Sequence, residues 1–420
     1  MMRFLTIACT VLVLLAGCNN QALDLCDITQ PDCQEDIYYA DLRVRGDGYD
    51  PFAGIPPIRT ISEDQFRTEL EDQAAKAAAQ PENAQPWWDT ALVILGLVPS
   101  TGTTQAASID NEVQNTAAYY SLTQRNVTVI SHPAVSTDPF EPFYNMSALA
   151  HELIHALQDR ELNLKLQPRT TDEYFASKAL IEGDASLYQR LFGYGVTLPQ
   201  GYHFNSRDPL VSFSTWRDAN LSDDPNVEGN FPSLGPPFFA VQWLVYPLGG
   251  VWLADRWDKG GSTAVRHAYG QAPQRSLDFL LGPGVAAPAS KDIACEPTTP
   301  AEFRRNGRAY GIDSFGAVYF FAYLMGWKVP GSDSLASALL WRYDVIFVYF
   351  NQSTQKTAVL WRIELDSPLP DSVLALLTSP GGPRVVQTGT TLAGTTLMIT
   401  ASDDPAFLAT WNPGTACPGP

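Results

Sequence analysis

The feature that most constrains this chain is the run His151-Glu152-Leu153-Ile154-His155. Residues four apart lie on one face of an α-helix, so His151 and His155 can present two imidazoles to one metal ion. Glu152 lies about 100° around the helix from His151, where it can touch a metal-bound water without binding the ion. Zinc lowers the pKa of such a water to about 7, and a neighbouring carboxylate can accept its proton. The run therefore predicts a catalytic-type zinc site with Glu152 as general base; a helix with two surface histidines is the alternative.

Glu182 is the candidate for the third protein ligand that a catalytic zinc ion needs. It lies in a predicted helix among the apolar residues Ala179, Leu180, Ile181, Ala185 and Leu187. A carboxylate is costly to bury there unless it is paired or binds a metal. Gly183 costs a helix interior about 1 kcal/mol relative to alanine, which is explained if two backbones approach closely at this point. A glutamate on a solvated helix face is the alternative.

Three further residues bear on the class of metal site. The longer three-histidine motif needs glycine at position 158 and histidine at position 161, but the chain has Gln158 and Glu161 there. Asp184 lies two residues after Glu182 and faces away from it on a helix. We therefore expect Asp184 to orient a ligand histidine rather than to bind the ion.

The composition indicates a folded protein with a sizeable core. Hydrophobic residues make up 45% of the 420 residues and charged residues 17%, which is typical of globular rather than disordered chains. The net charge of -18 and the lack of a basic patch exclude nucleic acid as a partner.

The N-terminus predicts a lipoprotein signal peptide over residues 1–17. Arg3 precedes an apolar run from Phe4 to Leu15, which is too short to remain as a membrane-spanning helix. The run ends in the sequence LAGC at Cys18, which resembles a bacterial lipobox, where the peptide is cut before the cysteine and the cysteine carries lipid. We expect an extracytoplasmic protein anchored through Cys18 to the cell membrane or the outer membrane. An ordinary secretory signal is the alternative.

Four cysteines remain beyond the signal and the lipid site: Cys26, Cys33, Cys295 and Cys417. An even number in an oxidising compartment favours disulfides. The simplest pairing joins Cys26 to Cys33 and Cys295 to Cys417, with free thiols as the alternative. Zinc binding by these cysteines is not expected, because the chain has no C-x-x-C pair.

Periodicity predicts a mainly helical chain with strands near its end. Predicted helices cover residues 63–79, 87–97, 147–159, 171–192, 238–254, 262–269 and 315–326. Predicted strands cover residues 126–130, 344–350, 357–365, 384–387 and 397–399. The expected fold class is therefore α+β, with a mainly helical domain over residues 61–330 and a small β-containing C-terminal portion over residues 331–420. Residues 18–60 are predicted to be a tether and an irregular N-terminal segment.

The two motifs together resemble the gluzincin class of zinc metallopeptidases, in which HExxH is followed downstream by Glu-x-x-Ala, here Glu182 to Ala185. The run HELIHALQD from His151 to Asp159 is similar to the HELTHALQDQ-like helix of a group of predicted bacterial and archaeal gluzincins. The second helix of that group carries an EGDA-type motif. The resemblance extends over about residues 62–366, and the zinc motifs are its most specific part.

The resemblance implies a zincin-like metallopeptidase core that binds one zinc ion and hydrolyses peptide bonds. It assigns His151, His155 and Glu182 as ligands and Glu152 as base. Because gluzincins bind substrate along an edge strand, the strand around Val127–Ile130 is expected to pair with an extended peptide.

A gluzincin also needs a hydrogen-bond donor for the tetrahedral intermediate. The candidates are His203, Tyr246, His267 and Tyr269, and Tyr246 is preferred, although each has a structural role as the alternative. The chain departs from the family pattern immediately after Tyr246, because Leu248 stands where tyrosine is expected.

Two other functions stay open. One is a non-catalytic envelope lipoprotein that keeps the zinc site and acts as a binding or assembly module. The other is a different zinc hydrolase, such as an amidase that acts on cell-wall peptides. Metal content and cleavage of a peptide library distinguish these functions from a peptidase.

Overall fold

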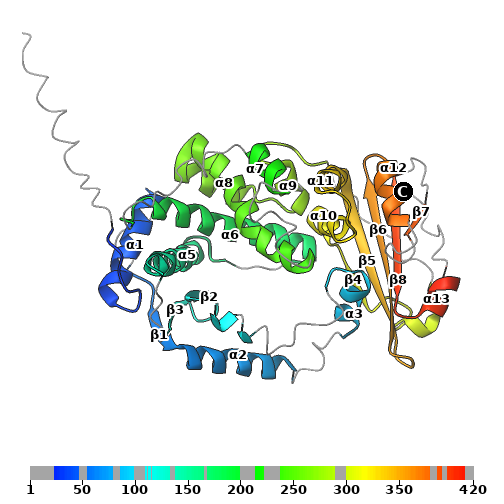
Figure 1. Ribbon diagram of the computed structural model, residues 1–420, viewed down its shortest axis with the longest axis horizontal. Helices are drawn as coiled ribbons and strands as arrows, with labels where there is room; N and C mark the ends of the chain where they lie inside the picture. Colours follow the sequence, from blue (N-terminus) through cyan, green and yellow to red (C-terminus); the bar gives the residue numbers. More distant parts are fainter. Residues whose placement is uncertain are drawn as a thin grey trace, which may run out of the picture.

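The computed structural model describes residues 23–46, 54–78, 86–98, 109–110, 112–114, 116–132, 138–164, 168–198, 213–221, 237–288, 299–378, 386–389 and 395–411. The predicted signal peptide and Cys18 lie outside these residues, and so does His203. The described part is α+β (Figure 1), which confirms the predicted class at this level. None of its helices combines the length and the apolar character needed to cross a membrane.

Three long helices form the centre of the fold: α5 (Glu141–Leu162), α6 (Thr171–Gly193) and α8 (Pro237–Gly270). α6 lies between α5 and α8 (Figure 1). Every residue of α6 from 179 to 188 is buried, including the carboxylates Glu182 and Asp184, because the helix packs against both α5 and α8. The middle of α6 therefore belongs to the core, and Glu182 is buried with it.

The backbones of α6 and α8 meet at two glycines. A Cβ on Gly183 would lie 2.3 Å from the carbonyl carbon of Gly249. A Cβ on Gly249 would lie 1.8 Å from the carbonyl oxygen of Ala179. No side chain fits at either position, so the predicted close backbone approach at Gly183 is confirmed.

The helix α2 (Glu63–Ala78) begins with a capping box formed by Ser62 and Gln65. The Ser62 N–H donates to Gln65 Oε1 at 2.9 Å, and the Gln65 N–H donates to Ser62 Oγ at 3.2 Å. These reciprocal bonds satisfy two donors that the first turn of a helix otherwise leaves unpaired.

Two central helices differ from their predicted bounds. α5 begins at Glu141, six residues before the predicted start at residue 147. Pro142 occupies its first turn, where a missing N–H costs nothing. α8 joins the predicted helices at 238–254 and 262–269, with non-helical backbone only at Gly260 and Gly261.

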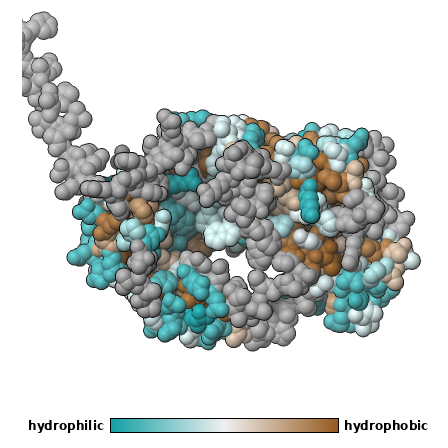
Figure 2. All heavy atoms as spheres, viewed as in Figure 1, coloured by the Kyte–Doolittle hydropathy of each residue, from teal (hydrophilic) through white to brown (hydrophobic). Residues whose placement is uncertain are grey.

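A three-stranded sheet packs against α5 in the strand order β1–β3–β2. Its strands are β1 (Ile58–Ser62), β2 (Ala118–Ser121) and β3 (Asn126–Ser131). The predicted strand β3 is central, because it pairs in parallel with β1 and antiparallel with β2. α2 covers the sheet on the side away from α5, and its charged outer face forms a hydrophilic surface at the lower edge of Figure 2.

The prediction that residues 18–60 are an irregular tether is wrong for two segments. Residues Pro31–Arg45 form α1, which packs against α5 and α6, and residues Ile58–Ser62 form β1. Polar and charged residues separate the apolar positions of α1, so its periodicity is weak in the sequence. It is a helix because its buried face, which includes Ile37, completes the core.

One of the two predicted disulfides is present in the described part. Cys26 is bonded to Cys33, which joins the turn before α1 to the first residues of that helix. The predicted pair of Cys295 and Cys417 lies outside the described residues.

The second sheet is antiparallel, with the strand order β4–β5–β6–β8–β7. Its strands are β4 (Gly311–Asp313), β5 (Trp341–Asn351), β6 (Lys356–Leu365), β7 (Val386–Gly389) and β8 (Thr396–Ser402). Trp361 of β6 packs against Phe320 and Tyr323 of α10 (Gly316–Gly326), so the sheet shares the main core with the helices. Because β4 precedes residue 330, the sheet spans the predicted boundary between residues 330 and 331. The remaining elements are α3 (Pro86–Ile94), α7 (Phe213–Asn220), α9 (Ser276–Leu281), α11 (Gly331–Leu339), α12 (Asp371–Thr378), α13 (Pro405–Thr410) and the short 3-10 helix Ala301–Phe303.

Candidate metal centre

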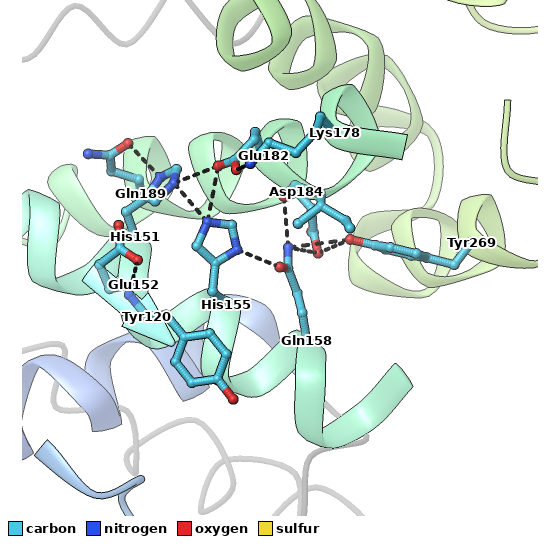
Figure 3. A network of polar contacts seen from close by, with 11 residues as sticks. Tyr120, His151, Glu152, His155, Gln158, Lys178, Glu182, Asp184, Gln189 and Tyr269 are labelled. Atoms are coloured by element: carbon cyan, nitrogen blue, oxygen red, sulfur yellow. Dashed lines mark hydrogen bonds and ion pairs between the residues drawn. The ribbon is translucent and has the colours of Figure 1, made fainter. Parts of the chain in front are cut away.

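Three side chains from α5 and α6 converge on one point (Figure 3). His151 Nε2 and His155 Nε2 lie 3.1 Å apart. Glu182 Oε2 lies 3.2 Å from His151 Nε2 and 3.1 Å from His155 Nε2. The side chains are at most 12% exposed. The structure therefore brings together the three ligands that the sequence predicts.

A glutamine orients each histidine ring. His151 Nδ1 lies 3.2 Å from Gln189 Oε1, and His155 Nδ1 lies 2.8 Å from Gln158 Oε1. An amide oxygen can only accept a hydrogen bond, so each Nδ1 carries a proton and donates it. In its neutral form, each imidazole then presents the lone pair of its Nε2 to the shared point, which is the tautomer that binds a metal.

Glu182 is surrounded by groups that favour its ionised form. Lys178, one turn earlier on α6, donates to Glu182 Oε1 and leaves Oε2 for the histidines. Burial alone raises the pKa of a carboxyl group. The two imidazoles and the lysine outweigh this effect and hold the pKa of Glu182 well below its ordinary value. Glu182 is therefore an anion, as a carboxylate that binds a metal must be.

The donor set fits a zinc ion. Tetrahedral zinc with ligand distances of about 2.0–2.1 Å needs ligand atoms roughly 3.3 Å apart, and the atoms here are 3.1–3.2 Å apart. Without a cation, two lone pairs and a carboxylate oxygen face one another. Burial lowers the pKa of His155, but Glu182 outweighs burial and raises that pKa to about 9. The point of convergence therefore requires positive charge, and two imidazoles with one carboxylate are ligands that suit zinc.

A buried polar network extends from His155 through Gln158 to Asp184 and Tyr269 (Figure 3), and from Asp184 to Arg45 of α1. Gln158 Nε2 donates to Asp184 Oδ2 at 2.8 Å. The Tyr269 hydroxyl donates to the same oxygen at 2.7 Å, and Arg45 Nη1 donates to it at 3.0 Å. Asp184 contacts the glutamine and not a histidine. Its effect on the orientation of His155 is therefore transmitted through Gln158.

Glu152 projects from α5 toward the small sheet (Figure 3). Its Oε2 accepts a hydrogen bond from the backbone N–H of Tyr120 in β2 at 2.7 Å. The prediction that the strand around Val127–Ile130 offers a free edge is wrong, because β3 is paired on both sides. Among the described residues β1 and β2 are the two edge strands, and β2 lies beside the candidate base.

Tyr246 of α8 lies at the site, unlike the other described candidates for an oxyanion donor. Its ring centroid is 5.8 Å from that of His151. Burial raises the pKa of Tyr246, and the two carboxylates of the site raise it further, so the hydroxyl stays protonated. Tyr269 belongs to the network around Asp184, and His267 is exposed.

Four residues that support the site are absent from the sequence prediction: Arg45, Gln158, Lys178 and Gln189. Three of them have a local signal, because helix residues three, four or seven apart share a face. Gln158 follows His155 by three positions, and Lys178 and Gln189 lie four before and seven after Glu182. Arg45 is brought to the site by the packing of α1 against α5 and α6. The HExxH motif gives no indication of this packing.

Comparison of the chain with protein-family models, with curated proteins and with solved structures finds no match. Any assignment of function therefore rests on the residues of the site and their geometry.

Proposed function

We propose that this chain is a zinc-dependent metallopeptidase of the gluzincin type, with a zincin-like core built from α5, α6, α8 and the β1–β3–β2 sheet. The observation that carries the proposal is the convergence of His151 Nε2, His155 Nε2 and Glu182 Oε2 within 3.2 Å of one another. These three residues hold the zinc ion. When bound, zinc supplies a Lewis acid that lowers the pKa of a water ligand to about 7 and polarises a carbonyl oxygen.

Glu152 acts as the general base. Its carboxylate accepts a proton from the attacking water and passes it to the amine that leaves when the peptide bond breaks. The backbone N–H of Tyr120 holds one oxygen of Glu152 in place, which fixes the orientation of the other. Tyr246, whose hydroxyl stays protonated, donates a hydrogen bond to the developing oxyanion.

The open edge of β2 is the proposed binding strand for substrate. The Ile130 N–H donates to the Ala117 oxygen at 2.8 Å, which sets the phase of the antiparallel ladder. Bonded residues alternate along such a strand, so Tyr119 faces β3 while Ala118 and Tyr120 turn their backbone groups to the open edge. The Tyr120 N–H already donates to Glu152, so an extended peptide pairs with the backbone groups of Ala118 and with the carbonyl oxygen of Tyr120.

The proposed setting is the cell envelope. It rests on the signal-like N-terminus, in which Cys18 stands at the end of the lipobox-like sequence LAGC. The disulfide between Cys26 and Cys33 is compatible with an oxidising compartment. Lipid on Cys18 would tether the peptidase to a membrane and leave the core in solution.

The Glu152→Gln variant tests the proposal. Glutamine keeps the size of the side chain but cannot act as the base, so we expect one bound zinc ion per chain and a fall in peptide cleavage of about 10²–10⁴-fold. The matched control is Glu71→Gln, an exposed glutamate of α2, which should leave both measurements unchanged. Metal analysis and chelator-sensitive cleavage of a peptide library are the two assays.

The same assays separate the alternatives. An undiminished rate in Glu152→Gln removes this residue from the mechanism. Zinc without any cleavage by the unaltered chain favours the non-catalytic envelope module, and cleavage restricted to cell-wall peptides favours an amidase. A chain that binds no zinc contradicts the proposal as a whole.

A further inference from the structure

A cleft lies beside the part of α8 that follows the metal centre. It has a volume of about 580 Å³, and its walls come from α8, α9 and the segments that flank α9. Trp252 and Arg256 of α8 line it, about 9 and 15 Å further along the helix axis than Tyr246. None of the metal-centre residues borders this cleft.

Arg256 is a cation without an anion. Its guanidinium carbon lies 3.4 Å from the centroid of the Trp252 ring, so the two groups are stacked. Arg256 Nη1 is inaccessible to solvent and has no hydrogen-bond partner. Within the described part of the chain, no carboxylate forms an ion pair with this side chain. Burial lowers the pKa of Arg256, and only the neighbouring Asp255 acts in the opposite direction.

Trp252 adds a second unsatisfied donor on the same wall. The residue is 3% exposed, and its Nε1 is inaccessible and has no hydrogen-bond partner. Its ring centroid is 5.1 Å from that of Phe279 in α9, so the indole is held between the guanidinium and the core. Buried donors are nearly always paired in proteins, so an acceptor that reached these two donors, one helical turn apart on α8, would satisfy both.

The other charged groups of the cleft are already matched. Arg275 donates to the carbonyl oxygen of Pro288 at 2.7 Å and to Asp278 Oδ1 at 3.4 Å. Asp278 Oδ2 accepts from the backbone N–H groups of Gln274 and Arg275. The cleft therefore carries one uncompensated positive charge, in a chain whose net charge is -18.

We propose that this cleft binds a small organic anion, with the oxyanion, a carboxylate or a phosphate, held by Arg256 and Trp252. A guanidinium matches the geometry of either oxyanion and donates two parallel hydrogen bonds to it. The cleft has the volume of a small-molecule site, and its remaining wall includes the apolar side chains of Ala272, Val285 and Ala287. The ligand is thus an organic acid or phosphate ester with an apolar portion, rather than an inorganic ion.

The test is isothermal titration of the purified full-length chain with benzoate, phenyl phosphate and uncharged benzyl alcohol. These probes share a ring and differ in the polar group, so the two anions distinguish a carboxylate from a phosphate site. We expect saturable binding of at least one anion and none of the alcohol. Arg256→Gln should weaken the affinity by about tenfold or more, and Trp252→Phe, which keeps the ring and loses the donor, by a smaller factor.

The control is Arg169→Gln, which removes the same charge from a side chain that is 85% exposed and precedes α6. It should leave the affinity unchanged. Thermal unfolding of each variant verifies that the fold is retained. Binding that survives in Arg256→Gln places the anion elsewhere, at the metal centre for example, and overturns the proposal. Binding of benzyl alcohol as tight as that of the anions overturns it too, because the cleft would then recognise only the ring.

Discussion

Replacement of Gly249 by alanine tests the helix contact on which the metal centre depends. The new Cβ would lie 1.8 Å from the carbonyl oxygen of Ala179 and 2.9 Å from the Cα of Gly183. Even favourable contacts between carbon and oxygen need about 3.3 Å, so α6 and α8 must separate by roughly 1.5 Å at this point. Both obstructing atoms belong to the backbone, and no change of rotamer relieves the clash.

Two effects of opposite sign determine how much the substitution lowers the free energy of unfolding. Alanine stabilises a helix interior by about 1 kcal/mol relative to glycine. Overpacking costs about 1–3 kcal/mol, and more where the backbone has to move. Because the backbone has to move here, we expect the upper end of that cost, and Gly249→Ala should lower the free energy of unfolding by about 2 kcal/mol or more. Because Glu182 adjoins Gly183, displacement of α6 also moves this carboxylate relative to the histidines, and zinc affinity should fall.

Gly250→Ala is the matched control in the same helix. Its Cβ would lie 3.6 Å from Ser186 Cβ and 3.8 Å from the Gly183 oxygen, which are ordinary contacts. This variant should be as stable as the unaltered chain or up to about 1 kcal/mol more stable. Urea unfolding and competitive zinc titration measure both effects. Equal urea midpoints for the two variants would refute the argument from close backbone approach.

Tyr246→Phe removes the proposed oxyanion donor and keeps the ring, so kcat should fall by about 10²-fold or more at unchanged zinc content in steady-state assays. Arg45→Met leaves Asp184 as an unpaired buried charge and should lower the free energy of unfolding by about 3–5 kcal/mol in urea. Adding Asp184→Asn to this variant should recover most of the lost free energy of unfolding. Burial raises the pKa of Asp172 to about 7, whereas the unfolded chain has the usual value of about 3.9. The folded state therefore holds this proton more tightly, and the free energy of unfolding should fall as pH rises from about 4 to 7. Asp172→Asn should flatten that part of the pH profile.

The sequence predicts those elements whose local pattern agrees with their final environment. β5 and β6 are long runs of β-branched and aromatic residues, and they form the centre of the second sheet. α1 has a weak pattern and becomes a helix through its contacts with α5 and α6. β2 has four residues and, within the described part of the chain, pairs with β3 alone. Short edge strands and peripheral helices depend on tertiary packing, which a local pattern does not contain.

The same distinction holds for the site. His151, His155 and Glu182 can be found because each lies on a helix whose other residues identify the buried face. Arg45 cannot be found in this way, because it lies in a segment predicted to be irregular and its partner Asp184 is 139 positions away. Long-range charge pairs have no periodic signal, whatever their importance to the fold.

The hydrogen bonds that hold the rings of His151 and His155 bear on the choice between a hydrolase and a non-catalytic zinc protein. Both Nδ1 atoms donate to neutral amides, of Gln158 and Gln189, rather than to carboxylates. Asp184 contacts Gln158 and not the histidines, and its charge is neutralised by an ion pair with the buried Arg45. Lys178 further offsets the charge of the single anionic ligand. A structural zinc site is closed by four protein ligands, often anionic thiolates. The three candidate ligands in the described part of the chain carry one negative charge. They would preserve the Lewis acidity of a bound ion, and that balance favours the proposed hydrolase.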